Sequence, residues 1–399
     1  RALDEPTPRW RYRESVRHTL PEFSPRVSSG TMVGMLKTTI DLSAIAHNVR
    51  LIKEKVGPEV KLMCVVKADA YGHGAAKVVP VMARAGADCF GVATLREAVN
   101  LRRAGVDAPI VAWIWQTDEI LEEALANGIE VAVNSLEQAH KLVKADFPAE
   151  VYVKVETGMH RSGVDEEDWA ETFKVLRNAP HIKVLGLMSH FACADEPDNP
   201  HNDAQEEAFR TALQLAREIG LECPINHLAN SPAVLTRPSS YFEQVRVGAA
   251  CYGLEPIEGR EHGLRPAMTW SGQIFNVKPI KPGEGTCYGL TWKADKPGFL
   301  ATVDCGYADG LPRGYQGDLR VGIGGHLYPQ VGRICMDQIV VDLGENPHGV
   351  DTGQDAVIFG NGGVSATDLA AAAGTINYEV VCLPDGRTER EYIGEEDAQ

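Results

Sequence analysis

Hydrophobic and polar positions alternate in a regular way between residues 61 and 248. Short apolar runs recur eight times in this region, as KLMCVV, CFGVAT, PIVAWI, IEVAV, EVYVKV, KVLGLMSH, INHLAN and QVRVG. Most are separated by segments with apolar residues at helical spacing, such as LREAVNLRRAG. Eight strand and helix units are typical of a (β/α)8 TIM-type barrel, although an open doubly wound sheet gives a similar alternation. The number of units favours the barrel.

Two changes in this pattern set the expected domain limits. Residues 1–36 are rich in Arg, Pro, Glu and Ser without periodicity, which predicts a flexible N-terminal extension. Residues 37–265 are expected to form the barrel. From Pro266, strand-like runs such as SGQIFNVKPI and FLATVDCGY alternate with Gly-rich turns, so residues 266–395 are predicted to form a mainly β domain. Within that domain, SATDLAAAAGTINYEVV predicts a helix that returns into one more strand.

Composition and charge narrow the possible functions. The chain has 399 residues, of which 44% are hydrophobic and 24% charged, as in an ordinary globular protein. A net charge of −16 argues against nucleic-acid or anionic-membrane partners, because these need a basic face. No apolar stretch approaches the roughly 20 residues of a membrane span. The nine cysteines include no Cys-x-x-Cys pair, which predicts reduced thiols in a cytoplasmic enzyme and no metal site.

The residues that close the apolar runs are the candidates for chemistry, since catalytic groups of barrels project from the carboxyl ends of the strands. Charged residues also end strands simply because strands end at water. Six of the eight ends are nevertheless polar in a suggestive way, and they include Lys67, Lys154 with the downstream Arg161, His190, Asn230 with Ser231, and Arg246 followed by Gly248.

Lys67 is the most informative of these residues. A lysine in a partly desolvated pocket has its ammonium form disfavoured, so its amine becomes nucleophilic and can form a Schiff base with an aldehyde. Pyridoxal 5'-phosphate supplies such an aldehyde, and barrels often bind phosphate with the loops after their seventh and eighth strands. Ser231 closes the seventh run, and Gly248 and Ala249 follow the eighth. The sequence therefore predicts a pyridoxal-phosphate enzyme.

Nine motifs carry a resemblance to a known family. They are VVKADAYGHG, VKVETGMHRSG, SHFACAD, HLANSPA, VRVGAACYGL, GTCYGLTW, CGYADGLPR, GRICMDQ and INYEVV. Together they resemble the alanine racemases, which are barrel-type (fold type III) pyridoxal-phosphate enzymes, in order from Lys37 to Tyr392. The first motif alone would also fit other barrel proteins that bind this cofactor. It contains Asp69 where many relatives have asparagine.

The resemblance implies two catalytic bases on opposite faces of the substrate, since racemisation removes a proton on one side of Cα and returns it on the other. Lys67 holds the cofactor and serves one face. Tyr288, from the β domain of the partner subunit, serves the other. A free tyrosine has a pKa of about 10, so this base needs nearby cationic or hydrogen-bonding groups that favour its deprotonated form. His190 and Arg246 are the candidates. A homodimer with shared active sites follows.

The resemblance also implies a cofactor-binding set that the strand ends had partly suggested. Its members are Lys67, Tyr71, His190, Asn230, Ser231, Arg246, Gly248, Ala249 and Tyr378. Arg246 matches the residue that donates to the pyridine nitrogen, where most enzymes with this cofactor place a carboxylate. Because arginine keeps its own proton and leaves that nitrogen neutral, the carbanionic state is less stabilised and transamination is suppressed.

The remaining implied residues orient or admit the substrate. Arg161 and the backbone of Met336 match the contacts to the substrate carboxylate. Lys154 matches a lysine that is often carbamylated in relatives, and a carbamate would hold Arg161 in place. The channel through which substrate enters is expected to involve Asp195, Tyr307 and Arg313, with Tyr378 at its narrow end and Asp337 as support.

Alanine is the substrate that the resemblance implies, with D-alanine supplied to cell-wall peptidoglycan. A serine-preferring racemase would share every motif, although related enzymes of that kind replace the channel tyrosine by a smaller polar residue. An amino-acid decarboxylase has a comparable barrel and β domain but presents a carboxylate to the pyridine nitrogen. A non-catalytic pyridoxal-phosphate carrier resembles only the barrel, which leaves the β domain and Tyr288 unexplained.

Overall fold

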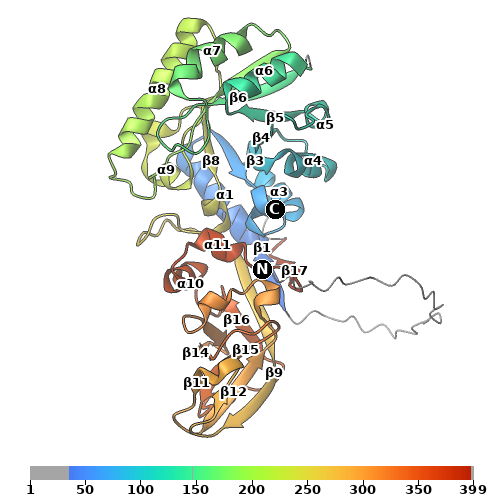
Figure 1. Ribbon diagram of the computed structural model, residues 1–399, viewed down its shortest axis with the longest axis vertical. Coiled ribbons are helices and arrows are strands. Elements are labelled where there is room, and N and C mark those ends of the chain that lie inside the picture. The colour runs from blue at the N-terminus through green and yellow to red at the C-terminus, as the bar shows by residue number, and fades with distance from the viewer. Residues whose placement is uncertain (1–35, 146, 397–399) are drawn as a thin grey trace, which may run out of the picture. The chain divides into compact units, whose positions relative to one another are not determined.

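A computed structural model describes residues 36–145 and 147–396 of the chain (Figure 1). It contains a ring of parallel strands surrounded by helices, followed in the chain by a mainly antiparallel domain. The expected extension over residues 1–36 lies outside the described residues apart from Leu36. None of the described helices is long and apolar enough to cross a membrane. The described part of the chain also holds no cluster of acidic, His or Cys side chains suited to a metal ion.

Seven parallel strands form most of the ring, in the order β7-β6-β5-β4-β3-β2-β8. Their bounds are β2 (Lys61–Val65), β3 (Cys89–Thr94), β4 (Ile110–Ile114), β5 (Ile129–Val133), β6 (Ala149–Lys154), β7 (Ile182–Met188) and β8 (Gln244–Val247). Each coincides with one of the predicted apolar runs, because strands buried on both faces read as continuous hydrophobic stretches. The predicted barrel is confirmed.

The remaining predicted run, INHLAN, closes the ring without forming a regular strand. The amide of Ile225 donates to the carbonyl of Leu185 in β7 (2.9 Å), and the amide of Arg246 in β8 donates to Ala229 (2.9 Å). A β-carbon added to Gly186 would lie 1.7 Å from the carbonyl oxygen of Ile225, so the two backbones approach closely at this point. Residues 225–229 therefore bridge β7 and β8 as an irregular eighth strand.

Helices cover the outside of this ring (Figure 1). They are α1 (Leu42–Val56), α3 (Ala75–Arg84), α4 (Leu95–Arg103), α5 (Glu122–Ala126), α6 (Leu136–Ala145), α7 (Glu166–Arg177), α8 (His201–Ile219) and α9 (Ser231–Thr236). Local capping explains several of their starting points. In α4, for example, Thr94 Oγ1 accepts from the amide of Glu97, and the carboxylate of Glu97 accepts from the amide of Thr94 (2.9 Å).

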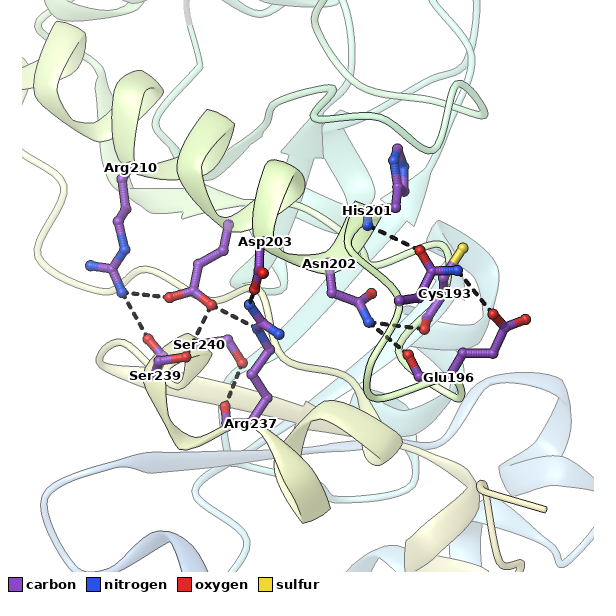
Figure 2. A network of polar contacts seen from close by, with 11 residues as sticks. Cys193, Glu196, His201, Asn202, Asp203, Arg210, Arg237, Ser239 and Ser240 are labelled. Atoms are coloured by element: carbon purple, nitrogen blue, oxygen red, sulfur yellow. Dashed lines mark hydrogen bonds and ion pairs between the residues drawn. The ribbon is translucent and has the colours of Figure 1, made fainter.

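Helix α8 is joined to two neighbouring segments by a polar network (Figure 2). The carboxylate of Glu206 accepts from Arg237 Nε at 2.8 Å, and Arg237 directly follows α9. The side-chain amide of Asn202 donates to the carbonyls of Cys193 (3.1 Å) and Glu196 (3.0 Å) in the loop after β7. The network therefore fixes α9 and that loop, which both carry predicted site residues, to the same helix.

The C-terminal domain is built on an eight-stranded sheet in the order β12-β15-β14-β13-β16-β9-β1-β17, in which β12 also pairs with β9. The strands are β1 (Lys37–Asp41), β9 (Met268–Ile280), β12 (Gly298–Val303), β13 (Arg320–Ile323), β14 (His326–Val331), β15 (Ile339–Gly344), β16 (Asp355–Phe359) and β17 (Glu389–Ile393). The prediction of a mainly β domain is confirmed. Strand β1 precedes the barrel in the chain, yet it pairs with β9 and β17 of this sheet.

The strand predicted after the helix of this domain is wrong. Helix α10 (Ala366–Ala373) is followed by a second helix, α11 (Asn377–Val381). Asn377 is buried and its side-chain amide donates to the carbonyl of Glu255 at 3.0 Å, while Val380 and Val381 are buried as well. An apolar run of this length does not distinguish a buried helix from a strand, so tertiary contacts decide its conformation.

Candidate active site

The turn that follows β2 places Lys67 and Tyr71 in an unusual backbone conformation. Residues 68–71 are all non-glycine and have φ angles of 50 to 56°. For such residues the left-handed helix costs roughly 1–2 kcal/mol each. The amide of Ala70 donates to Val66 (2.9 Å), and the amide of Ala68 donates to the carboxylate of Glu97 (2.7 Å). Strain of this kind is characteristic of functional sites.

Lys67 follows β2 at the carboxyl end of the ring and has a perturbed amine. Burial lowers the pKa of Lys67, and the positive charges of Arg161 and Arg246 lower it further. The carboxylate of Glu97 acts in the opposite direction. A lysine with a lowered pKa carries a larger fraction of neutral amine at neutral pH, which is the nucleophilic and basic form.

A cradle of hydrogen-bond donors lies beside the turn, formed by Tyr71, Ser231 and Gly248. The hydroxyl of Ser231 accepts from the amide of Gly248 at 3.1 Å. A β-carbon on Gly248 would lie 2.4 Å from the phenol oxygen of Tyr71, so only glycine allows this approach. The ring of Tyr71 packs against Tyr252 (4.8 Å between centroids) and Tyr378 (6.2 Å). Burial raises the pKa of Tyr71, which therefore keeps its proton as a donor.

The first residues of two helices, α9 and a short 3₁₀ helix, lie next to this cradle. Asn230 is the N-cap of α9, and its side-chain oxygen accepts from the amide of Ala233 at 3.4 Å. Ala249 begins the short 3₁₀ helix η2 (Ala249–Tyr252) directly after Gly248. The predicted cradle residues are thus brought together at one end of the ring.

Arg246 is buried and is held by three acceptors from two neighbouring segments. Its guanidinium donates to His227 Nδ1 (2.6 Å), to His190 Nδ1 (3.0 Å) and to the carbonyl of Ser189 (2.6 Å). Burial lowers the pKa of Arg246 to about 10, so it remains a cation at neutral pH. Burial and the charge of Arg246 lower the pKa of both histidines well below the usual range, so both imidazoles are neutral.

Lys154 belongs to the same group of positively charged side chains as Lys67, Arg161 and Arg246 (the cationic group). It is buried, and its amine donates to Ser162 Oγ at 2.5 Å. Burial, followed by the charges of Arg246 and Arg161, lowers the pKa of Lys154 to about 8. Positive groups in such proximity repel one another, so the site favours bound anions that would relieve the repulsion.

Tyr378 is half-buried beside Tyr71 and lies within electrostatic range of Asp195. Burial raises the pKa of Tyr378 to about 12, and the negative charge of Asp195 adds to the effect. Tyr378 belongs to α11 of the C-terminal domain, whereas Tyr71, its ring neighbour, belongs to the barrel. This is a point where the two domains meet.

A second set of predicted residues lies in the C-terminal domain, comprising Tyr288, Tyr307, Arg313, Met336 and Asp337. Tyr288 is 72% exposed and Met336 is 52% exposed. Tyr288 begins the short helix η3 (Tyr288–Leu290), and the carbonyl of Met336 accepts from the amide of Ala308 at 3.0 Å. Among the described residues, no hydrogen bond or ion pair joins this set to Lys67.

Arg387 connects two loops of this second set. Its guanidinium donates to the buried carboxylate of Asp309 (2.7 Å) and to Asp337 (2.8 Å). Asp309 ends the short helix that begins at Tyr307, and Asp337 follows Met336. The ion pairs therefore fix the relative positions of the two loops.

Several residues of the site were not predicted from the sequence, among them His227, Tyr252 and Glu97. His227 begins the HLANSPA motif and lies within the seventh run, so its position in the ring offered a signal. Tyr252 packs on Tyr71 and donates to the carbonyl of Val65 at 2.8 Å. For Tyr252 and Glu97 no local pattern indicates the contact, because each depends on distant segments.

The fold and the site together define a class: a barrel that holds a lysine of lowered pKa beside a polar cradle, followed by a β domain. Comparison with known proteins gives the family. The model of the alanine racemase N-terminal domain matches residues 40–256, and that of the alanine racemase C-terminal domain matches residues 267–392. The chain belongs to the alanine racemase family, and it is an isomerase that acts on an amino acid.

Individual relatives agree with this assignment. Alanine racemase of Corynebacterium efficiens is 58% identical over 366 residues, which cover 91% of this chain and 100% of the relative. Alanine racemase of Mycolicibacterium smegmatis is 45% identical over 368 residues, covering 90% of this chain and 94% of the relative. The solved structure of alanine racemase from Streptomyces coelicolor A3(2) superposes with a TM-score of 0.88 at 38% identity, covering 91% and 99% of the two chains.

Proposed function

We propose that this enzyme interconverts L-alanine and D-alanine with pyridoxal 5'-phosphate, in active sites that two identical subunits share. The observation that carries the proposal is the grouping of Lys67, Arg246 and the Tyr71–Gly248 cradle at one end of the barrel. This cofactor needs an amine for its aldehyde, a polar partner for its ring nitrogen and hydrogen-bond donors for its phosphate, and these three groups of residues would supply them.

The donor set fits the cofactor. The phenol of Tyr71, the hydroxyl of Ser231 and the backbone around Gly248 and Ala249 would hold the phosphate, with Asn230 fixing the start of α9. The amides of Gly248 (3.1 Å) and Ala250 (3.4 Å) both donate to the hydroxyl of Ser231, so backbone and side-chain donors converge at this turn, as in other anion-binding turns. His190 and His227 orient the guanidinium of Arg246, which would donate to the ring nitrogen without giving it a proton.

When bound, the cofactor lowers the free energy needed to remove the α-proton, because its conjugated ring takes up negative charge. The amine of Lys67 would hold the cofactor covalently in the resting enzyme. Once the amino group of the substrate had displaced it from the aldehyde carbon, the freed amine would take or return the proton of Cα on one face. Arg161 and the backbone of Met336 hold the carboxylate of the amino acid. These residues act on substrate atoms that Arg246 and the cradle keep in place.

The second base is Tyr288 of the partner subunit. Its high exposure in the single chain supports this role, since a base for another subunit's site must reach beyond its own domain. Each barrel would then face the β domain of the partner, and a two-fold symmetric dimer would contain two equivalent active sites. A monomer would hold Lys67 and Tyr288 in separate half-sites.

A carbamate on Lys154 would complete the substrate side of the site. The pKa of about 8 leaves a substantial fraction of neutral amine, and only the neutral amine reacts with carbon dioxide. The reaction joins the amine nitrogen to carbon and releases one proton. The resulting negative charge would neutralise part of the cationic group and hold Arg161.

Alanine is the proposed substrate, because the channel that admits it would be narrowed by Tyr378, Asp195, Tyr307 and Arg313. A small opening favours a methyl side chain over larger ones. We further propose that the enzyme works in the cytoplasm, where D-alanine is consumed in making peptidoglycan, without a nucleic-acid or membrane partner. The net charge of −16 supports the last point.

The proposal is tested by incubating the purified enzyme and its cofactor with L-alanine in deuterium oxide. Appearance of D-alanine with deuterium at Cα is the expected result, because the second base carries a solvent proton to the opposite face. Full retention of chirality, together with a normal absorbance band of bound cofactor, would show a carrier without turnover and contradict the proposal.

A further inference from the structure

We infer that Asp69 and Arg390 act as positioning residues that hold the left-handed turn carrying Lys67 and Tyr71. The inference rests on the proposed function insofar as it concerns cofactor binding. The geometry itself is independent of that function, because it describes how a strand from the C-terminal domain secures a turn of the barrel.

The carboxylate of Asp69 makes two contacts in different directions. Oδ1 accepts from the amide of Ala75 at 2.7 Å, and Ala75 is the first residue of α3. Oδ2 accepts from Nη1 of Arg390 at 2.8 Å. One side chain in the middle of the turn is thus bonded to the barrel helix that follows it and to β17.

Strand β17 lies directly against the turn at a second point. The phenol of Tyr392 donates to the carbonyl of His73 at 3.2 Å. A β-carbon on Gly74 would lie 1.9 Å from that phenol oxygen and 2.9 Å from Arg390 Nη1, so the strand and the turn are in close contact. Strand β17 is itself paired in parallel with β1 along its whole length.

These contacts matter because the turn has little intrinsic preference for its shape. Four consecutive non-glycine residues with positive φ persist only where surrounding structure holds them. Lys67 and Tyr71 stand at the two ends of the turn, so a relaxation of the backbone would move the amine and the phosphate-binding phenol together. An exposed ion pair alone contributes little to stability. Its effect here is therefore expected on cofactor binding more than on unfolding.

The test compares four variants of the full-length enzyme. Asp69→Ala removes both contacts, Asp69→Asn keeps the acceptor for Ala75 and loses the charge, and Arg390→Ala removes only the partner. Glu391→Ala is the matched control, because Glu391 is the next residue of β17 and pairs with Lys37 (3.0 Å) away from the turn.

Affinity for pyridoxal phosphate, the visible absorbance band of the bound cofactor and the urea midpoint are measured for each variant. Asp69→Ala and Arg390→Ala are expected to lose about tenfold in cofactor affinity and to shift the band, with a nearly unchanged midpoint. Asp69→Asn should fall between these and the wild type, and Glu391→Ala should stay within about twofold. Unchanged affinity and band in both Asp69→Ala and Arg390→Ala would overturn the inference.

A second measurement keeps the two proposals distinguishable. Hydrogen exchange of the Ala70 and Gly72 amides is followed in wild type and Arg390→Ala without cofactor, and faster exchange in the variant is expected. If the wild type failed to bind pyridoxal phosphate, the proposed function would be wrong. Faster exchange in Arg390→Ala would still support the positioning role of Asp69 and Arg390. Equal exchange rates in the two proteins would overturn the positioning role of Asp69 and Arg390, even if the enzyme were fully active.

Discussion

The phenol oxygen of Tyr71 lies 2.4 Å from the position that a β-carbon would occupy on Gly248. These two residues come from different ends of the barrel sequence, one after β2 and the other after β8, and the two strands are neighbours in the ring. The cradle proposed for the phosphate therefore depends on the absence of a side chain at a single position.

Gly248→Ala is predicted to displace Tyr71 or the backbone after β8. We expect cofactor affinity to fall by about tenfold or more, which corresponds to about 1.4 kcal/mol, and this is measured by titration with pyridoxal phosphate. The double variant Gly248→Ala/Tyr71→Phe serves as the control, because it removes the closest clashing atom. If adding alanine at position 248 were equally damaging with and without the Tyr71 hydroxyl, the steric explanation would be wrong.

Bicarbonate is predicted to label Lys154. With a pKa of about 8, roughly half of the Lys154 amine is neutral at pH 8 and available to react. Enzyme equilibrated with ¹³C-bicarbonate should show a carbamate resonance that is missing in Lys154→Ala. Depletion of bicarbonate should raise the KM for alanine in the wild type only, because Arg161 then loses its anionic neighbour. A missing resonance together with bicarbonate-independent kinetics would rule out the modification.

Glu130 is predicted to make stability depend on pH. It is 9% exposed on β5, and burial, followed by the charge of Glu150, raises its pKa from 4.5 to about 7. Below pH 4.5 the carboxyl is protonated in both states, so the group has no differential effect. As pH rises from 4.5 to 7 the unfolded state ionises first, so the free energy of unfolding falls, and the loss is complete above 7.

Glu130→Gln should remove this loss. Relative to the wild type, its free energy of unfolding is expected to rise by about 2.5 kcal/mol between pH 5 and pH 8, as measured by urea denaturation. Glu122→Gln, at an exposed position of α5, is the control and should follow the wild type. Parallel pH profiles of the free energy of unfolding for wild type and Glu130→Gln would contradict the prediction, because the buried carboxylate would then be no less stable than in the unfolded chain.

Much of the barrel was predictable because its strands are buried on both faces and read as apolar runs. The polar residues after those runs, such as Lys67 and Arg246, were predictable because parallel strands end at a common edge. The run at 225–229 was recognised even though it forms an irregular strand, since its composition reflects burial more than regular hydrogen bonding.

Features that depend on distant segments were not predictable from local patterns. Strand β1 looked like the start of the barrel, but its partners β9 and β17 lie more than 200 residues away in the chain. The left-handed turn at 68–71 contains no glycine, so nothing in its composition indicates positive φ angles. Helix α11 was mistaken for a strand because its burial, rather than its residue types, selects the helix.

The central claim is that Lys67 of one subunit and Tyr288 of the other form one active site. Lys67→Ala should lose the visible band of bound cofactor and all activity, whereas Tyr288→Phe should keep the band and lose about 10²–10⁴-fold in turnover. Each variant alone is therefore nearly inactive. In a heterodimer of the two, one site lacks both residues and the other regains both.

The most direct measurement is the alanine racemase activity of a mixture in which equal amounts of Lys67→Ala and Tyr288→Phe subunits have been unfolded and reassembled together. Half of the dimers are then mixed, and half of their sites are complete, so about a quarter of wild-type activity is expected. A mixture no more active than its two separate components would contradict a site shared between subunits.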